Sequence, residues 1–413
     1  MTFFAEAPSI GISQSNRPLN PMVDSSTFTE RANGMESTGT AGATAVADTR
    51  GEPLDVVVVG AGQAGLSAAY YLQHRGLRPE RDFVVLDANE GPGGAWRHRW
   101  PSLTFDAAHG LHDLPGLPLG VPDPKEPASA VVSRYYGSYE QQYGLPVQRP
   151  VRVARIEDEP DGLLMVTAAS GETWLTRTVV SGTGTWDRPH WPYYPGREAF
   201  AGRQLHTHDF RSAEEFRGER VLVVGGGTSA LQFLLQLDAA GATTFWSTRR
   251  APDFTATPFD AEWGVDVERR VNERTRAGLP PLSVVAATGL PLTETYRAGI
   301  EAGVLVSRGK LSRIAEDAVV FADGSREVVD VILWATGFRA ALDHLAPLQL
   351  REPGGGILMA PDAVSVVREP RLFLVGYGSS ASTVGATRAG RAGAAAALRR
   401  LRADADRRVT LSA

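Results

Sequence analysis

Short apolar runs alternate with helix-like stretches from residue 55 onward. Apolar runs rich in β-branched residues and bounded by polar residues predict buried strands. They lie at 55–60, 82–87, 164–168, 178–182, 220–225, 242–247, 318–321, 328–335 and 371–376. Helices are predicted over 64–75, 129–142, 228–240 and 386–402. The alternation indicates an α/β fold with mostly parallel sheets.

The first strand–helix unit carries a glycine pattern. Its strand leads into Gly60, Gly62 and Gly65, spaced as GxGxxG. The first glycine permits a tight turn, the second lets the backbone approach a diphosphate, and the third allows close packing of helix and strand. The helix N-terminus then faces the anion. The next strand ends at Asp87, where a carboxylate would accept hydrogen bonds from a ribose hydroxyl. The unit therefore predicts a dinucleotide site.

A second unit repeats this pattern with a different strand end. Gly225, Gly227 and Ala230 follow the strand, and the pattern allows alanine at its third position. The strand after the helix leads into Arg249 and Arg250 rather than an acid. Arginine suits a 2′-phosphate, so the unit favours NADPH over NADH. The alternative is that both arginines belong to a solvated loop.

Composition narrows the class of protein. The 413 residues include no cysteine, which removes disulfides, thiolate metal sites and a redox-active cysteine pair, and we expect no metal site. The formal charge of −5 and the absence of a basic block give no sign of a nucleic-acid partner. No apolar run is long enough for a membrane span, and the first residues lack the features of a signal peptide. We expect a cytoplasmic protein in which residues 1–50 form a disordered tail.

Three further segments accompany the two loops. Residues 93–96 read Gly-Gly-Ala-Trp, and residues 335–338 read Ala-Thr-Gly-Phe, with an earlier echo of the latter in the Gly-Thr-Gly at 182–184. Between the loops, Phe200, Gly202, His206 and Phe210 are spaced as FxGxxxHxxxF. Together the five motifs resemble the flavin-containing monooxygenase-like family, whose fingerprint is FxGxxxHxxx(W/Y). Phe210 departs from the final Trp or Tyr, because it keeps the aromatic ring but lacks a polar group.

The resemblance implies an α/β protein with two dinucleotide-binding, Rossmann-like domains, the NADPH domain being inserted into the FAD domain. The FAD-binding domain is expected at 51–190 and 326–413, and the NADPH-binding domain at 191–325. The implied activity is that of a monooxygenase. NADPH reduces FAD, the reduced flavin forms a C4a-(hydro)peroxyflavin with dioxygen, and one oxygen atom passes to a small organic substrate. We expect N- or S-oxygenation and leave open whether the chain forms a homodimer.

The resemblance also implies which positions bind the two cofactors. Those expected around FAD are Gly60, Gly62, Gln63, Ala64, Gly65, Asp87, Ala88, Gly94, Ala95, Trp96 and Thr185. Those expected around NADPH and the linker are Gly225, Gly227, Thr228, Ser229, Ala230, Arg249, Arg250, Thr336 and Gly337.

The segment after Trp100 holds the expected catalytic residues. Asp106 is similar in placement to an acid of the Baeyer–Villiger branch, although its spacer is one residue short. His109 or His112 would supply a proton, since histidine titrates in the useful range. His206 is expected to couple the domains near NADPH. The alternatives are that Asp106 is a helix cap or a loop acid and that the histidines are structural. The small residues of segment 376–388 would let a cofactor or substrate approach closely, and the alternative there is a plain helix start.

Other functions share parts of this pattern. Flavin-dependent disulfide reductases have the same two nucleotide units but need a cysteine pair, which the chain lacks. An NADPH-dependent flavin reductase that does not oxygenate needs no thiol and stays open, as does a protein that binds FAD without turnover. Baeyer–Villiger oxidation stays open within the monooxygenases.

Overall fold

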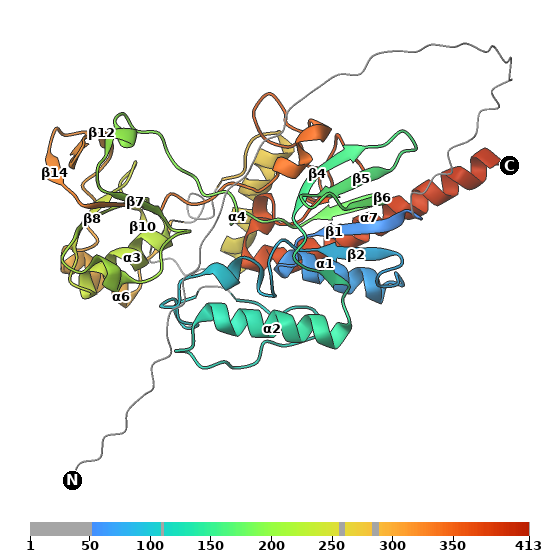
Figure 1. Ribbon diagram of the computed structural model, residues 1–413, viewed down its shortest axis with the longest axis horizontal. Helices are drawn as coiled ribbons and strands as arrows, with labels where there is room; N and C mark the ends of the chain where they lie inside the picture. The colour runs from blue at the N-terminus through green and yellow to red at the C-terminus, as the bar shows by residue number, and fades with distance from the viewer. Residues whose placement is uncertain (1–51, 109–110, 256–260, 283–288, 413) are drawn as a thin grey trace, which may run out of the picture. The chain divides into compact units, whose positions relative to one another are not determined.

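The computed structural model describes residues 52–108, 111–255, 261–282 and 289–412 (Figure 1). Strands and helices alternate through this part of the chain, and four sheets form. Both predicted strand–loop–helix units are present at the expected positions.

The larger sheet has seven strands in the order β3-β2-β1-β6-β5-β4, and β16 also pairs with β6. Around β1 all pairs are parallel, whereas β4, β5 and β6 pair in an antiparallel manner. Its strands are β1 (Leu54–Val59), β2 (Phe83–Leu86), β3 (Val147–Gln148), β4 (Val153–Asp158), β5 (Leu164–Ala168), β6 (Thr173–Ser181) and β16 (Leu372–Leu374). The strands β1 and β2 bury apolar side chains on both faces, as the parallel sheet of an α/β fold requires.

Helices α1 (Gln63–His74), α2 (Ala128–Tyr143) and α7 (Thr383–Ser412) accompany this sheet. Helix α7, at the C-terminal end of the chain, runs alongside α1 (Figure 1). The contact is close at Gly390, where a Cβ would lie 2.4 Å from the carbonyl oxygen of Ala64. Glycine is therefore needed for α7 to pack against the first turn of α1.

The second sheet contains four parallel strands in the order β7-β15-β8-β9. They are β7 (Arg203–His206), β15 (Val331–Trp334), β8 (Arg220–Val224) and β9 (Thr243–Ser247). Helix α3 (Thr228–Ala239) follows β8 and buries Leu231, Leu234 and Leu237. The other α-helices within the described residues are α4 (Ala261–Arg276) and α6 (Glu294–Glu301).

Two smaller sheets complete the strands. An antiparallel sheet contains β12 (Leu311–Ile314), β13 (Ala318–Phe321) and β14 (Arg326–Val328). A parallel pair contains β10 (Phe254–Thr255) and β11 (Leu290–Pro291).

The chain leaves the larger sheet after β6, builds the second sheet and returns at β16, so the expected α/β fold with an inserted unit is confirmed. The boundary expected at residue 326 stays a prediction, and the pairing of one strand bears on it. Strand β15 pairs with β7 and β8, so the chain stays with the second sheet through Trp334. The apolar strand itself was predicted, but its sequence does not specify which sheet it joins.

The two connections between these sheets are hydrogen-bonded to each other. The backbone N–H groups of His190, Arg339 and Ala341 donate across them, at 2.8–2.9 Å. The hydroxyl of Thr183 also donates to the carbonyl of Ala341. The outgoing segment 182–190 and the returning segment 337–341 therefore form a short paired ribbon.

Among the described residues, no helix combines the length and the apolar character that a membrane crossing needs.

Candidate active site

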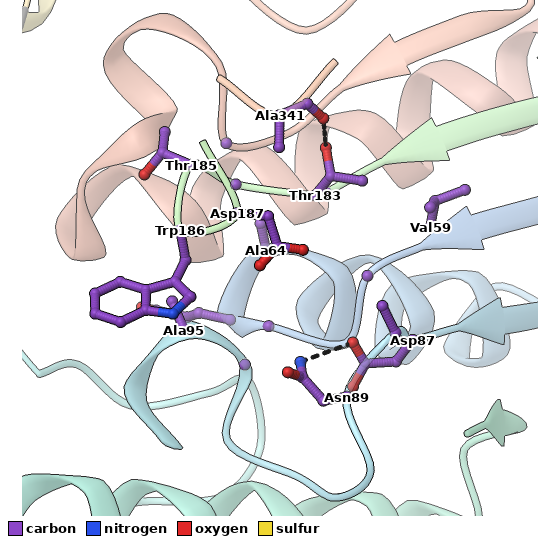
Figure 2. Close-up of a pocket in the computed structure, with 18 of the residues that line it drawn as sticks. Val59, Ala64, Asp87, Asn89, Ala95, Thr183, Thr185, Trp186, Asp187 and Ala341 are labelled. Atoms are coloured by element: carbon purple, nitrogen blue, oxygen red, sulfur yellow. Dashed lines mark hydrogen bonds between the residues drawn. The ribbon is translucent and has the colours of Figure 1, made fainter. Parts of the chain in front are cut away.

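An open pocket of about 490 Å³ lies around the N-terminus of α1. Figure 2 shows Ala64, at the start of α1, between the strand end carrying Asp87 and the connection carrying Thr183 and Trp186. The predicted FAD positions that line it are Gly60, Gly62, Gln63, Ala64, Asp87, Ala88, Gly94, Ala95, Trp96 and Thr185. One set of sequence motifs, spread over more than a hundred residues, thus meets in one cavity.

The glycines of the first loop each meet a separate geometric requirement. Gly60 has a φ of +95°, and a Cβ there would lie 2.6 Å from the Gly182 carbonyl oxygen. A Cβ at Gly65 would lie 1.8 Å from the Gly60 carbonyl oxygen, so Gly65 packs against the turn rather than lining the pocket. A Cβ at Gly62 would face open space, and no side chain caps α1. The first N–H groups of α1 are therefore open to an anion such as a diphosphate.

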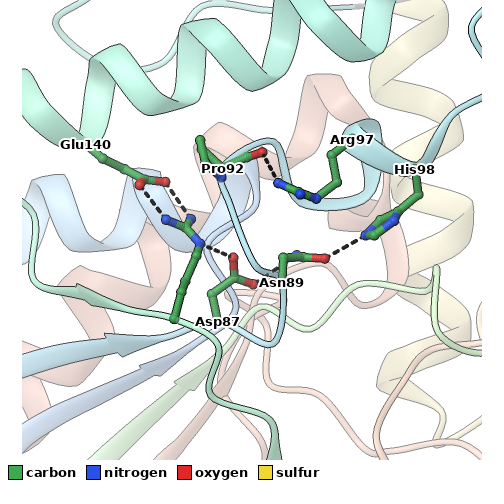
Figure 3. Close-up of polar contacts among 7 residues, drawn as sticks. Asp87, Asn89, Pro92, Arg97, His98 and Glu140 are labelled. Carbon is green, nitrogen blue, oxygen red and sulfur yellow. Dashed lines mark hydrogen bonds and ion pairs between the residues drawn. The ribbon is translucent and has the colours of Figure 1, made fainter. Parts of the chain in front are cut away.

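Asp87 is fixed by a buried network at the end of β2. Arg149 donates through Nε to Asp87 at 2.7 Å and through both terminal nitrogens to Glu140 at 2.6 and 2.7 Å. Asn89 donates to the other Asp87 oxygen, and His98 contacts Asn89 at 2.6 Å (Figure 3). Burial acts to lower the pKa of Arg149, but its bonds to Glu140 and Asp87 outweigh that effect and raise it. Arg149 therefore stays charged and holds the acid at the pocket wall.

The second loop has the same backbone design. Gly225 has a φ of +147°, and a Cβ there would lie 2.0 Å from the Ala335 carbonyl oxygen. Gly227 caps α3 without a side-chain bond, and the helix begins at Thr228 and Ser229, with Ala230 fully buried. Arg249 and Arg250 follow β9 and are exposed, and neither forms an ion pair within the described part of the chain. These residues present an open helix N-terminus with two free cations at the next strand end.

Thr336 and Gly337 lie in the paired ribbon rather than in the pocket. The Thr336 hydroxyl donates to the His190 carbonyl, and the Gly337 carbonyl accepts from the His190 N–H. Both groups thus help to join the two connections, and their contact with a cofactor stays a prediction.

His206 joins the same ribbon and is fully buried. Its Nε2 lies 3.1 Å from the Gly337 carbonyl, and its Nδ1 accepts from the His208 N–H. Burial lowers the pKa of His206 to about 4, so the ring is neutral at pH 7 with its proton on Nε2. The predicted coupling role fits this geometry, whereas proton transfer does not, because both ring nitrogens are engaged.

Asp106 does not line the pocket, contrary to the expectation of a catalytic acid. Its carboxylate is partly exposed and pairs with Lys125 at 2.5 Å, and it accepts from the Thr104 hydroxyl. These bonds, with that to Lys125 the largest cause, hold the pKa of Asp106 below its usual range. His112 is exposed and also lies away from the pocket lining. His109 lies outside the described residues.

Phe210 shows why an apolar ring is tolerated at the end of the fingerprint. It is buried among Trp100, Phe216 and Phe233, with ring centroids 4.3–5.9 Å away. A hydroxyl or an indole N–H gains no partner in such surroundings.

Sequence reasoning missed several pocket residues. Arg99 and His344 line the pocket, and Arg149 supports Asp87 from behind the pocket wall without lining it. None of the three is among the positions expected from the sequence. The small-residue segment 376–388 follows β16. Gly376, Ser380 and Ser382 do line the pocket, which favours the expected close approach of a ligand.

Comparison with known proteins gives the same picture. The family model described as pyridine nucleotide-disulphide oxidoreductase matches residues 57–376. A solved flavin-containing monooxygenase from Stenotrophomonas maltophilia is similar at 35% identity and a TM-score of 0.71, over 84% of this chain and 98% of that one. The indole-3-pyruvate monooxygenase YUCCA1 of Oryza sativa is 26% identical over 78% of this chain and 86% of its own.

A third relative, flavin-containing monooxygenase 5 of Oryctolagus cuniculus, is 24% identical over 70% of this chain and 63% of its own. Flavin monooxygenases of this family use FAD and NADPH. Thiol chemistry, which the family description includes, has no cysteine here to perform it. The chain therefore belongs to the pyridine nucleotide-disulphide oxidoreductase family, as one of its flavin-dependent monooxygenases.

Proposed function

We propose that this protein uses NADPH and FAD to transfer one oxygen atom of dioxygen to a nitrogen or sulfur atom of a small organic substrate. The observation that carries the proposal is the contrast between two open helix N-termini: one is followed by the buried acid Asp87, the other by the exposed cations Arg249 and Arg250.

The pocket at α1 is suited to FAD. The open N–H groups behind Gly62 would hold the diphosphate, and Asp87 would accept the ribose hydroxyls. When bound, FAD supplies the electron transfer from NADPH and the activation of dioxygen. Gly376 and Ser380, near the start of α7, would pack close to the cofactor on the other side of α1.

The second loop is suited to NADPH. An open helix N-terminus after Gly227 would face its diphosphate. The two guanidinium groups at the following strand end would bind the 2′-phosphate, and no carboxylate among the described residues forms an ion pair with either. NADH lacks this phosphate and gains nothing from the arginines.

Oxygenation at nitrogen or sulfur is favoured over Baeyer–Villiger oxidation by the position of Asp106. The acid that resembles the Baeyer–Villiger branch is paired with Lys125 outside the pocket, so it is not placed to act on bound flavin. A reductase that does not oxygenate is the second alternative, since it requires the same two nucleotide sites.

Stopped-flow absorbance of the NADPH-reduced holoenzyme mixed with dioxygen tests the proposal. We expect a transient absorbance band that forms after the reduced flavin and before the oxidised flavin, and that lasts longer when NADP⁺ is present. When a trial amine or thioether is added, we expect less hydrogen peroxide to form than NADPH is consumed. Direct return to oxidised flavin with stoichiometric peroxide would reject oxygenation and leave the reductase. A cyclic ketone assayed in parallel distinguishes Baeyer–Villiger oxidation.

A further inference from the structure

Arg99 is a cation in the pocket wall that no mechanism above employs. It directly follows the short 3-10 helix Gly94–His98 and lines the pocket. Its guanidinium carbon lies 4.5 Å from the ring centroid of Trp186 and 5.7 Å from that of Trp96. The indoles of Trp96 and Trp186 therefore both contact the charged group and hold it in place.

The acids that line the pocket are all paired with other arginines. Each forms an ion pair at 2.7–2.8 Å, and the pairs are Asp87 with Arg149, Asp187 with Arg152 and Asp343 with Arg188. Among the described residues, none of these acids and no other carboxylate forms an ion pair with Arg99. The pocket therefore carries one guanidinium whose charge is not neutralised by any carboxylate in the described part of the chain.

The atoms of Arg99 show the same lack of partners. Its Nε is buried and has no hydrogen-bond partner within the described part of the chain. Burial lowers the pKa of Arg99 to about 10, and no neighbouring acid raises it, yet the group stays charged at pH 7. A buried cation is costly unless it is paired, and contact with two indoles recovers only part of that cost. A negatively charged ligand would offset the remaining cost of burying this cation.

We propose that Arg99 is a binding residue for an oxyanion, a phosphate or a carboxylate, carried by a molecule that enters this pocket. The planar guanidinium matches the paired oxygens of either group, and the indoles fix its orientation. This goes beyond the proposed function, which assigns the FAD diphosphate to the N-terminus of α1. The oxyanion can come from a dinucleotide diphosphate or from a carboxylate of the substrate.

The test compares Arg99→Met with Arg97→Met in the holoenzyme. Arg97 lies on the same 3-10 helix and donates to the Pro92 carbonyl, but it does not line the pocket, so its variant controls for losing one arginine from this segment. Three quantities are measured: FAD release on dilution from free-flavin fluorescence, NADP⁺ affinity from the flavin absorbance change, and benzoate affinity from the same signal, with neutral benzamide beside it.

We expect Arg99→Met to weaken at least one of the three by about tenfold, the effect of one lost charge-assisted contact. Arg97→Met should leave all three within about twofold of wild type. Faster FAD release or weaker NADP⁺ binding assigns the site to a diphosphate. Weaker binding of benzoate with unchanged benzamide assigns it to a carboxylate.

The proposal would be overturned if FAD release, NADP⁺ affinity and benzoate affinity were all the same in Arg99→Met as in wild type. Benzoate that changes the flavin absorbance of neither protein counts as unchanged. Equal losses in Arg97→Met would overturn it too, since they would trace the effect to the segment rather than to the charge. Should Arg99→Met fail to fold, the same criteria apply to Arg99→Lys. That variant keeps the charge without the planar fork, and we expect it to lose about threefold.

Discussion

The two glycine loops of this chain share a backbone design and differ in what surrounds the end of the next strand. In both, the first glycine has a positive φ and packs against the carbonyl of a neighbouring strand's end, at Gly182 or at Ala335. The acid after the first loop is buried in an ion network, whereas the arginines after the second are exposed and unpaired within the described residues. On the proposed function, both loops would bind a dinucleotide, and the two strand ends would distinguish FAD from NADPH.

The largest effect is expected from the third position of each loop. Gly65→Ala would place a Cβ 1.8 Å from the Gly60 carbonyl oxygen, whereas the second loop already has alanine at Ala230. We expect Gly65→Ala to lose bound flavin and to lower the free energy of unfolding by roughly 5 kcal/mol. Ala230→Gly should cost about 1 kcal/mol. Flavin content and urea unfolding are measured for both variants. If Gly65→Ala kept its full flavin content, the first loop would tolerate alanine at its third position as the second loop does.

Arg149→Met should have the next largest effect, because it removes the support of the first strand end. Asp87 and Glu140 would stay buried without a cation, which costs about 3–5 kcal/mol, and FAD release should accelerate. The control is Arg78→Met, which breaks an ion pair between an exposed arginine and Asp82, so we expect a much smaller loss of stability. Similar unfolding free energies for the two variants would mean that the buried network does not hold Asp87.

His206 connects the second sheet to the ribbon, and it should make stability depend on pH. The pKa of His206 is about 4 in the folded chain and near 6.5 unfolded, so only the unfolded chain binds this proton between those values. The contribution of neutral His206 to the free energy of unfolding is therefore fully present above pH 6.5. It declines by about 3 kcal/mol as the pH falls to 4. His206→Gln should lack this share of the decline. His344, whose pKa burial also lowers to about 4, is present in both proteins and cancels.

Arg249→Ala should have the smallest effect, and it tests only the strand end that follows the second loop. Loss of one contact to a 2′-phosphate should raise the KM for NADPH about tenfold, or about 1.4 kcal/mol, and leave the KM for NADH within about twofold. Steady-state kinetics with both coenzymes measure this. Equal changes with the two would assign Arg249 to the solvated loop.

Local patterns allowed much of the fold and of the first site to be predicted. The glycine spacings, the buried strands and Asp87 are each contained within a few residues, so the sequence alone indicates them. Strand β7 was missed because three of its four residues are polar and it lies at a sheet edge. An edge strand has only one neighbour, and its sequence has no strict pattern to maintain.

The parts of the site that could not be predicted depend on distant pairs. Arg149 contacts Asp87 across 62 positions, and His206 contacts Gly337 across 131. Asp106 follows the motif in sequence, yet the chain turns so that it contacts Lys125 instead of the pocket. A motif indicates which residue types are present, but the tertiary fold decides which of them meet.

The close contact of α7 with α1 has a consequence for the order in which the chain folds during synthesis. The ribosome makes the first glycine loop early, but helix α1 lacks its contact with α7 until Gly390 emerges, and β6 lacks β16 until residue 374 does. The second sheet needs nothing later than Trp334. Although domains commonly fold from the N-terminal end, here the larger sheet is begun before the second sheet and completed after it. The pocket at α1 likewise lacks part of its lining until residues 375–386 have been made.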